Sequence, residues 1–182
     1  MLRRFGFKRV GPSLYKAVIS DHPVFLCLSG VGCQAAARAA ERLVDLGAKE
    51  LVSAGFCGAL VSALHVGDLV TDRVMTVDHP ARTPPERRAL TELANAVAVD
   101  METQAVVEAG TRRGVPIRFL RVISDEFQDD LTPLLGSKGS FSAWRMACRL
   151  FNPFVWRLAS KLWRQSVVAR ARLADALQGL CG

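Results

Sequence analysis

The sequence predicts an α/β fold with a largely parallel sheet and helices on both of its faces. Along the first 135 residues, short runs rich in apolar and β-branched residues alternate with segments of helical periodicity. Gly47 and Gly114 directly follow two of the helical segments, at positions where helices commonly end. The composition, 50% hydrophobic and 23% charged, is that of a globular domain and excludes a disordered chain.

The first half of the chain predicts two strands, a helix and a buried strand. Asp21-His22-Pro23 is a turn signal between two β-rich runs, and the alanine-rich segment further on has helical spacing. In order, we expect strands at 14–19 and 24–28, a helix at 34–46, and a strand at 50–54 that ends in the glycine-rich loop Gly55-Phe56-Cys57-Gly58.

The second half of the domain predicts two helices between three strands. Thr83 precedes Pro84 and lies three residues before Glu86, which is the spacing of a capping box, so a helix is expected to begin there. In order, we expect a strand at about 68–77, this short helix, a strand at 96–99, a helix at 102–113 and a strand at 117–123.

Basic residues are concentrated near the C-terminus. Residues 1–135 are neutral overall, so the net charge of +7 comes from residues 136–182, which also hold all three tryptophans. We expect a domain at 1–135 and a basic helical tail at 136–182, with two helices separated at Asn152-Pro153. In the second helix, the apolar residues at helical spacing are Leu158, Leu162, Ala169, Leu173 and Leu177. Three interpretations stay open: the tail packs on the domain, lies on an anionic membrane or apolar partner, or binds nucleic acid, for which no motif is present.

Cysteine usage and hydropathy predict the compartment. The five cysteines are an odd count without a C-x-x-C pair, which indicates reduced thiols rather than a disulfide framework or a zinc site. No apolar run approaches the roughly 18 residues that span a bilayer, and no apolar stretch follows the basic N-terminus as in a secretory signal. We therefore expect a cytoplasmic protein without a metal site.

The segment Ser29-Gly30-Val31-Gly32 lies between a predicted strand and a predicted helix. Glycines let backbone N–H groups approach an anion, which the positive end of the helix dipole also attracts. The segment matches the dinucleotide-binding fingerprint as well, but the acidic residue required at the end of the next strand is absent, since Glu50 stands before that strand. An anion-binding loop, a nucleotide-cofactor site and a simple tight turn stay open.

Two further segments place carboxylates at the ends of predicted strands, where open α/β sheets bind their ligands. In Asp100-Met101-Glu102, the carboxylate of Glu102 either caps a helix or accepts hydrogen bonds from a vicinal diol such as that of a ribose. In Arg121-Val122-Ile123-Ser124-Asp125, the carboxylate of Asp125 is either a solvated loop carboxylate or a partly desolvated acid suited to proton donation.

Taken in this order, the three segments resemble the superfamily of purine nucleoside and uridine phosphorylases, which includes the methylthioadenosine/S-adenosylhomocysteine nucleosidases. The resemblance covers residues 26–70 and 96–126, and its specific strings are VDMET and RVISD. It implies a three-layer α/β/α sandwich around a mixed, mostly parallel central sheet. The implied activity is cleavage of the N-glycosidic bond of a nucleoside, with phosphate or water as the attacking group.

The resemblance also implies roles for individual residues. Met101 and Glu102 are similar to the ribose-contacting pair, with Glu102 holding the 2′ and 3′ hydroxyls. Asp125 is similar to the acid that hydrogen-bonds or protonates purine N7 so that the base leaves neutral, and Ser124 would support the base or orient Asp125. The pocket for phosphate or the attacking water would be lined by Ser29, Gly30, Gly32, Gly55, Phe56 and Gly58. No cofactor is implied beyond phosphate as a co-substrate.

One branch of the superfamily, the hopanoid-associated phosphorylases, is similar over TVDHPARTPPERRAL and VDMET. Members of that branch act on adenosylhopane, in which the ribose is joined to a membrane lipid. This resemblance implies a lipid-linked adenosine as substrate and peripheral contact of the basic tail with the inner membrane surface. The superfamily implies a homo-oligomer, and no nucleic-acid partner is expected.

The sequence departs from the superfamily pattern in three places. It begins about where the family's second strand would be, so the family's first acidic residue has no counterpart. Ser53 stands where phosphorylases often have an arginine. Gly67-Asp68-Leu69-Val70 leads almost directly into Arg73, without the insertion that carries a base-stacking aromatic, so Phe127, Phe141 or a neighbouring subunit would have to supply one. The chain is therefore either an active phosphorylase or nucleosidase, or a shortened homologue without turnover that binds a ligand or serves as a membrane-associated partner.

Overall fold

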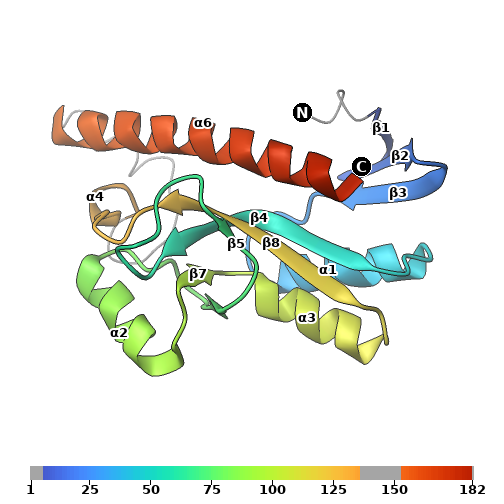
Figure 1. Cartoon of the computed structure of the whole chain (residues 1–182), viewed down its shortest axis with the longest axis horizontal. Coiled ribbons are helices and arrows are strands. Elements are labelled where there is room, and N and C mark those ends of the chain that lie inside the picture. The colour runs from blue at the N-terminus through green and yellow to red at the C-terminus, as the bar shows by residue number, and fades with distance from the viewer. Residues whose placement is uncertain (1–5, 136–152, 182) are drawn as a thin grey trace. The chain divides into compact units, whose positions relative to one another are not determined.

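The computed structural model describes residues 6–135 and 153–181, which fall into two compact units (Figure 1). Strands β4 (Leu51–Ala59) and β8 (Ile117–Asp125) both begin in unit 1 and end in unit 2, and each unit is described by itself. Unit 1 comprises Met1–Ala54, Met101–Leu120 and Ala174–Gly182, and unit 2 comprises Gly55–Asp100 and Arg121–Leu173. The first helix expected in the tail and Phe141 lie outside the described residues.

Unit 1 contains a three-stranded antiparallel sheet in the order β1-β2-β3. Ile19 pairs with His22, so Ser20 and Asp21 alone form the second hairpin loop, with φ values of 47° and 64°. Two residues of positive φ match the twist of a hairpin, so the turn lies one residue earlier than expected. The hydrophobic pattern missed β1 because that strand is short and mostly exposed. The strands are β1 (Lys8–Gly11), β2 (Leu14–Ile19) and β3 (His22–Cys27).

Helices α1 (Cys33–Asp45) and α3 (Thr103–Arg112) lie side by side in unit 1 (Figure 1). Both begin and end within one residue of the predicted positions. Their contact is made of small and apolar side chains, which allow the two backbones to approach closely. The buried residues of this cluster are Ala36 and Ala40 of α1, Val106 and Ala109 of α3, and Leu51 of β4. At the ends of the same two helices, Arg112 and Arg113 form ion pairs with Glu41 and Asp45.

The second sheet is mixed and has five strands in the order β5-β8-β4-β7-β6. The strand pairs described below are formed by residues of unit 2. Strand β8 pairs antiparallel with β5 (Leu69–Val70), and β4 pairs antiparallel with β7 (Ala98–Asp100). Strand β6 (Val74–Thr76) pairs parallel with β7. The mixed α/β sheet that the resemblance implied is confirmed, and its buried core in this unit is Cys57, Ala59, Val70, Ala98 and Ile123.

Two predictions about the strands are wrong. The segment Gly55–Gly58, expected to be a loop, continues the strand, and β4 ends only at Ala59. Glycine inside a strand often marks a place where another group approaches closely, and a hydrophobic pattern does not reveal that group. The strand expected at 68–77 is divided into β5 and β6, because Arg73, with a φ of 48°, redirects the chain between them.

Helix α2 (Pro84–Ala94) begins where the sequence predicts. The Thr83 hydroxyl accepts a hydrogen bond from the Glu86 N–H (3.3 Å), and the Glu86 carboxylate accepts one from the Arg82 N–H (2.7 Å). Further along the helix, the Thr91 hydroxyl donates to the carbonyl oxygen of Leu60, the residue after β4 (2.9 Å). These contacts fix both the start of α2 and its position against β4 within unit 2.

Among the described residues, β8 is followed by α4 (Thr132–Leu135) and by the long helix α6 (Pro153–Cys181), which begins at the predicted proline (Figure 1). Within unit 2, Ala169 of the predicted apolar stripe is buried, and Leu158, Leu162 and Leu173 are partly buried. On the adjacent side, Lys161 and Gln165 donate to the carboxylate of Asp129 at 2.5 Å and 3.1 Å. None of the described helices is long and apolar enough to cross a membrane.

Asp129 makes this attachment of α6 dependent on pH. Burial alone would raise the pKa of Asp129, but hydrogen bonds from Lys161, the Glu126 backbone and Gln165 outweigh burial and lower it below the usual 3.8. Because the folded pKa is lowered, the stabilisation is complete above about pH 4 and is lost as pH falls through the folded value. We expect Asp129→Asn to lower the free energy of unfolding by about 1–3 kcal/mol at neutral pH.

Urea unfolding of the wild type and of Asp129→Asn from about pH 7 down to pH 2 measures this effect. The difference between the two proteins should shrink as Asp129 becomes protonated. Asp175→Asn, which changes an exposed acid on the same helix, is the control and should differ little from the wild type throughout. A difference that stayed constant down to the lowest pH would contradict the assignment.

Candidate functional site

In unit 2, Ser124 and Asp125 are the last two residues of β8. The Asp125 side chain is 17% exposed, so it is not a solvated loop carboxylate. The Ser124 hydroxyl donates to Asp125 Oδ1 at 2.8 Å and lies 3.2 Å from the carbonyl oxygen of Cys57 on β4. The neighbouring serine thus holds one carboxylate oxygen in a defined orientation beside the sheet.

The other oxygen of Asp125 meets an arginine that no sequence pattern singled out. Arg87 lies on α2 with its side chain 0% exposed, and its Nη2 donates to Asp125 Oδ2 at 2.5 Å. Its Nη1 donates to the carbonyl oxygen of Ala59 at 3.0 Å, while its buried Nε–H has no acceptor among the described residues. Arginine and the serine hydroxyl both donate to the carboxylate, so Asp125 accepts hydrogen bonds through both of its oxygens.

Gly58 makes room for this ion pair. A Cβ at Gly58 would lie 2.7 Å from Asp125 Oδ2 and 3.2 Å from Arg87 Nη1. Both distances are shorter than ordinary contacts, so a larger residue would displace one of the partners. Gly58 was expected to line the pocket for phosphate or water with its backbone; the structure places it in β4, against the pair. Gly55 lies in β4 as well, and Phe56 between them is 40% exposed.

A second buried ion pair lies in unit 2, at the end of β7. Arg121 Nε donates to Asp100 Oδ2 at 2.8 Å, and the Thr76 hydroxyl donates to Asp100 Oδ1 at 2.8 Å. The Asp100 and Arg121 side chains are 0% and 3% exposed. Asp100, the first residue of the predicted carboxylate segment, therefore joins β6, β7 and β8, and its oxygens face these partners rather than a ligand.

In unit 1, Glu102 stands at the start of α3 and reaches the start of α1. Its Oε1 accepts a hydrogen bond from the Gly32 N–H at 2.7 Å, and its Oε2 has no hydrogen-bond partner among the described residues. The Met101 carbonyl oxygen accepts a hydrogen bond from Cys33 Sγ at 3.1 Å. Glu102 therefore caps α1, a favourable place for negative charge, and keeps a second oxygen for other donors.

The Ser29–Gly32 segment contains two glycines of positive φ. Gly30 and Gly32 have φ values of 85° and 96°, in the region that favours glycine, and no atom lies within 4 Å of a Cβ built on either. The Ser29 hydroxyl donates to the Gly30 carbonyl oxygen (2.9 Å). One backbone N–H of this segment, that of Gly32, is already bound by Glu102.

Two other kinds of site were considered near these residues, a cysteine nucleophile and a metal-binding cluster. Burial, reinforced by the charge of Asp125, raises the pKa of the Cys57 thiol to about 12, so the thiol stays protonated and is not a nucleophile at neutral pH. Within the part of the chain that the structure describes, no three His, Cys, Asp or Glu side chains are grouped so as to hold a metal ion.

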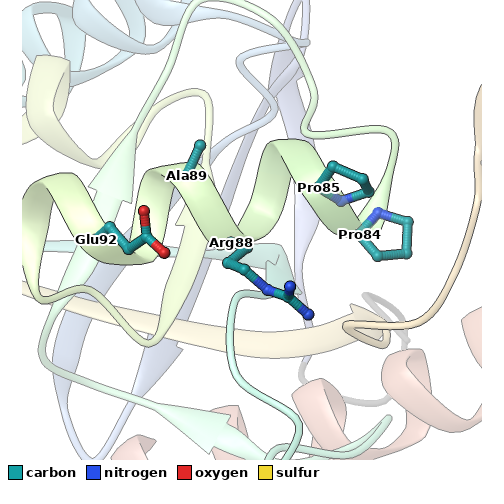
Figure 2. A pocket seen from close by; sticks show the side chains of 5 residues that line it. All are labelled: Pro84, Pro85, Arg88, Ala89 and Glu92. Atoms are coloured by element: carbon teal, nitrogen blue, oxygen red, sulfur yellow. The ribbon is translucent and has the colours of Figure 1, made fainter.

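Figure 2 shows a shallow hollow of about 260 Å³ on α2, lined by Pro84, Pro85, Arg88, Ala89 and Glu92. All five lie on one helix and none is a predicted site residue. The hollow is therefore separate from the carboxylates described above. Arg88, which lines it, is exposed, whereas the neighbouring Arg87 is buried.

The mixed α/β fold, with carboxylates at the ends of its strands, agrees with a match to a known family model. The chain belongs to the phosphorylase superfamily, whose family model matches residues 5–72 and 71–135. A guanosine phosphorylase from Halorubrum lacusprofundi is 37% identical to the chain over 82 residues, which are 39% of this chain and 33% of that relative. The match thus spans a third of that relative's length.

Solved structures with the same fold include two from Helicobacter pylori. A 5′-methylthioadenosine/S-adenosylhomocysteine nucleosidase with butyl-thio-DADMe-Immucillin-A has a TM-score of 0.64 and 16% identity, covering 88% of this chain and 91% of that chain. A native futalosine hydrolase has a TM-score of 0.63 and 16% identity, covering 91% of this chain and 90% of that chain. These similarities establish the fold.

The two glycines of β4 supply a matched test of the Asp125 environment. Gly58→Ala should lower the free energy of unfolding by about 1–3 kcal/mol, because its Cβ would push against Asp125 Oδ2. Gly55→Ala should be tolerated, since the nearest atom to its Cβ, Arg121 Nη1, lies at an ordinary 3.5 Å. Urea unfolding of both variants measures the difference, and equal stabilities would show that the pair does not need Gly58.

Proposed function

We propose that this chain cleaves the N-glycosidic bond of a purine nucleoside, by phosphorolysis or hydrolysis. The observation that carries the proposal is the carboxylate of Asp125, which is held at the end of β8 by Ser124 and Arg87 and remains 17% exposed. An oriented carboxylate of limited exposure is suited to hydrogen-bond or protonate purine N7. The purine base would otherwise leave with a negative charge, and this interaction lets it leave neutral. Membership of the phosphorylase superfamily supports the same reaction.

Glu102 is the proposed ribose ligand. Its Oε1 is occupied by the Gly32 N–H, and its Oε2 is available to accept hydrogen bonds from sugar hydroxyls. The Met101 side chain, which is half-buried beside it, would contact the sugar. In unit 1, we propose the backbone of Ser29, Gly30 and Gly32 as a contact for the attacking phosphate or water. In unit 2, we propose the same role for the backbone of Gly55, Phe56 and Gly58, and the absent side chain of Gly58 also leaves room for the Arg87–Asp125 pair.

The second candidate is a homologue that binds a ligand without turnover. One observation favours it: both oxygens of Asp125 already accept hydrogen bonds from protein groups, so a substrate must share them. Each carboxylate oxygen can accept two hydrogen bonds, so this occupancy leaves room for a base N–H. Turnover distinguishes the two candidates.

Release of adenine from adenosine, measured with and without inorganic phosphate, tests the activity. Phosphate dependence identifies a phosphorylase, and release without phosphate identifies a hydrolase. Asp125→Asn should lower kcat/KM at least about 100-fold, because a single positioned acid–base group typically contributes 10²–10⁴-fold. Because Asp125→Asn also leaves Arg87 without a carboxylate, circular dichroism must show that the variant is folded.

Asp130→Asn, an exposed acid in the loop after β8, is the control for this assay and should keep wild-type turnover. No adenine release from the wild type in either condition would reject the enzymatic proposal in favour of the binding protein.

We further propose that α6 brings the protein to an anionic membrane surface, consistent with a lipid-linked adenosine as substrate. The outward face of α6 carries Trp163, 65% exposed, and Val167, 46% exposed, beside the exposed Arg157, Arg164 and Arg170. The Arg170 guanidinium lies 5.4 Å from the centre of the Trp163 ring. An aromatic residue among arginines is typical of helices that lie in the membrane interface. The proposed homo-oligomer has no observation of its own.

Sedimentation with phosphatidylcholine vesicles, with and without phosphatidylglycerol, tests the membrane proposal. Each basic residue near an anionic surface contributes about 1 kcal/mol, so Arg164→Gln/Arg170→Gln should weaken binding roughly tenfold or more. The control is Arg88→Gln, which removes an exposed arginine on α2 rather than on α6 and should bind like the wild type. Equal binding to neutral and anionic vesicles, or none to either, would exclude this surface.

A further inference from the structure

The three-stranded sheet of unit 1 has a packed face and an exposed face. On β2, Ala17 is buried, whereas Lys16 and Val18 on either side of it are exposed, Val18 by 68%. Successive side chains of a strand point to opposite faces, so Lys16 and Val18 share the face that Ala17 does not. We call this the outer face; it begins at Lys16, because Leu14 on the same side is buried.

Two lysines from neighbouring strands meet on the outer face. Lys8 of β1 lies directly opposite Lys16 of β2, and Lys16 lies opposite Phe25 of β3. Directly opposed residues of antiparallel strands project on the same side with their Cβ atoms close together, and like charges in such a pair destabilise the sheet. An anion bound over the outer face would relieve the repulsion between Lys8 and Lys16.

The carboxylates of unit 1 do not neutralise these lysines. Among the described residues, neither Lys8 nor Lys16 has a carboxylate within ion-pair distance. Most acids of this unit are engaged elsewhere: Glu41 and Asp45 pair with Arg112 and Arg113, Glu50 pairs with Arg118, Glu102 caps α1, and Glu108 accepts from Gln104. Asp21 lies in the hairpin loop at the far end of β2, and Asp175 lies on α6. The outer face is therefore positively charged.

Two arginines add to this charge near the turn between β1 and β2. Arg9 Nε donates to the Gly11 carbonyl oxygen at 3.2 Å, and Arg42 Nη1 of α1 donates to the Pro12 carbonyl oxygen at 3.0 Å. Neither arginine forms an ion pair with a described carboxylate. Each guanidinium has five N–H donors, so both keep donors for an outside anion.

Exposed apolar side chains accompany the charges. Val18 lies opposite Pro23, which is also exposed, and Val10 of β1 is exposed as well. Basic residues beside exposed apolar residues are typical of surfaces that lie in the headgroup region of an anionic membrane. There the ammonium groups meet lipid phosphates, while lysine stems and apolar side chains reach the edge of the acyl region.

The aromatic residues of the sheet favour lipid over a single-stranded nucleic acid. Bases stack on open aromatic faces, but the Phe25 ring has the Lys16 Nζ over it, 5.3 Å from the ring centre. Tyr15 alternates with Lys16 along β2 and belongs to the opposite face of the sheet. The outer face therefore offers cations and aliphatic groups without a stacking platform.

We propose that the outer face of the β1-β2-β3 sheet is a docking surface for an anionic lipid bilayer. Lys8 and Lys16 bind lipid phosphates, and Val18 enters the apolar boundary beside them. This surface consists of residues of unit 1, whereas Trp163, Arg164 and Arg170 of the α6 proposal belong to unit 2. The inference goes beyond cleavage of a nucleoside and depends neither on that activity nor on α6.

Sedimentation of the full chain with phosphatidylcholine vesicles, with and without phosphatidylglycerol, tests this surface. Lys8→Gln/Lys16→Gln should weaken binding to the anionic vesicles at least about tenfold, because each basic residue near an anionic surface contributes to binding. The matched control is Arg38→Gln/Lys49→Gln, which removes two exposed positive charges of unit 1 from α1 and from the loop after it. The control should bind nearly like the wild type.

Folding of the variants is checked by urea unfolding. Lys8→Gln/Lys16→Gln should keep or slightly raise the wild-type midpoint, since it removes the repulsion between two exposed residues. Val18→Glu is a second, independent variant that keeps both lysines. Its carboxylate would face the anionic lipids, so it should also weaken vesicle binding at least about tenfold.

Combination with Arg164→Gln/Arg170→Gln separates this surface from α6. We expect the combined variant to bind more weakly than either double variant. If Lys8→Gln/Lys16→Gln binds like the wild type, or loses no more than its control, this inference is overturned and the α6 proposal stands. If the wild type binds no anionic vesicle, or binds neutral and anionic vesicles equally, this inference is overturned whatever the outcome of the adenine-release assay.

Fluorescence anisotropy with a labelled single-stranded DNA oligonucleotide tests the other class of polyanion. We expect no more than weak binding, which Lys8→Gln/Lys16→Gln leaves unchanged. Binding of the oligonucleotide that this variant abolishes, together with no binding to anionic vesicles, would assign the outer face to nucleic acid and overturn the lipid inference.

Discussion

A single buried positive charge organises the end of unit 2 where Asp125 lies. The Arg87 guanidinium is 0% exposed and cannot lose its proton, so a carboxylate has to stand within hydrogen-bond distance of it. That requirement places Asp125 at the last position of β8, demands a glycine at position 58 and ties α2 to β4 through the Ala59 carbonyl oxygen. Several separate features of the sequence therefore serve one electrostatic constraint.

The same constraint fixes the orientation of Asp125. Its carboxylate accepts a hydrogen bond from Arg87 through one oxygen and from Ser124 through the other, so its position and direction are both defined. The nearby Asp100–Arg121 pair follows the same physical principle at the ends of β7 and β8, with Thr76 as an additional donor. Together the two pairs hold the ends of these strands by hydrogen bonds as well as by apolar packing.

Glu102 and helix α6 each make structural contacts with only part of the side chain or helix. Glu102 caps α1 with one carboxylate oxygen, and the other oxygen is the one proposed for a ligand. In unit 2, helix α6 anchors Lys161 and Gln165 on Asp129, while Trp163 and the nearby arginines are exposed. The packing of α6 in this unit is therefore observed, and membrane binding through its exposed face is the proposal.

The sequence alone determined the elements whose signals are local: helix periodicity with the stops at Gly47 and Gly114, the Thr83 cap of α2, the start of α6 at Pro153, and the VDMET and RVISD strings that indicated the superfamily. Only the tertiary structure decided that Gly55–Gly58 is strand, that 68–77 is divided at Arg73, and that Arg87 is the partner of Asp125. The physical reason is that these features depend on groups far apart in the chain. A glycine next to another residue's side chain, or an arginine buried beside a carboxylate 38 positions later, has no periodicity or neighbour pattern that a linear sequence displays.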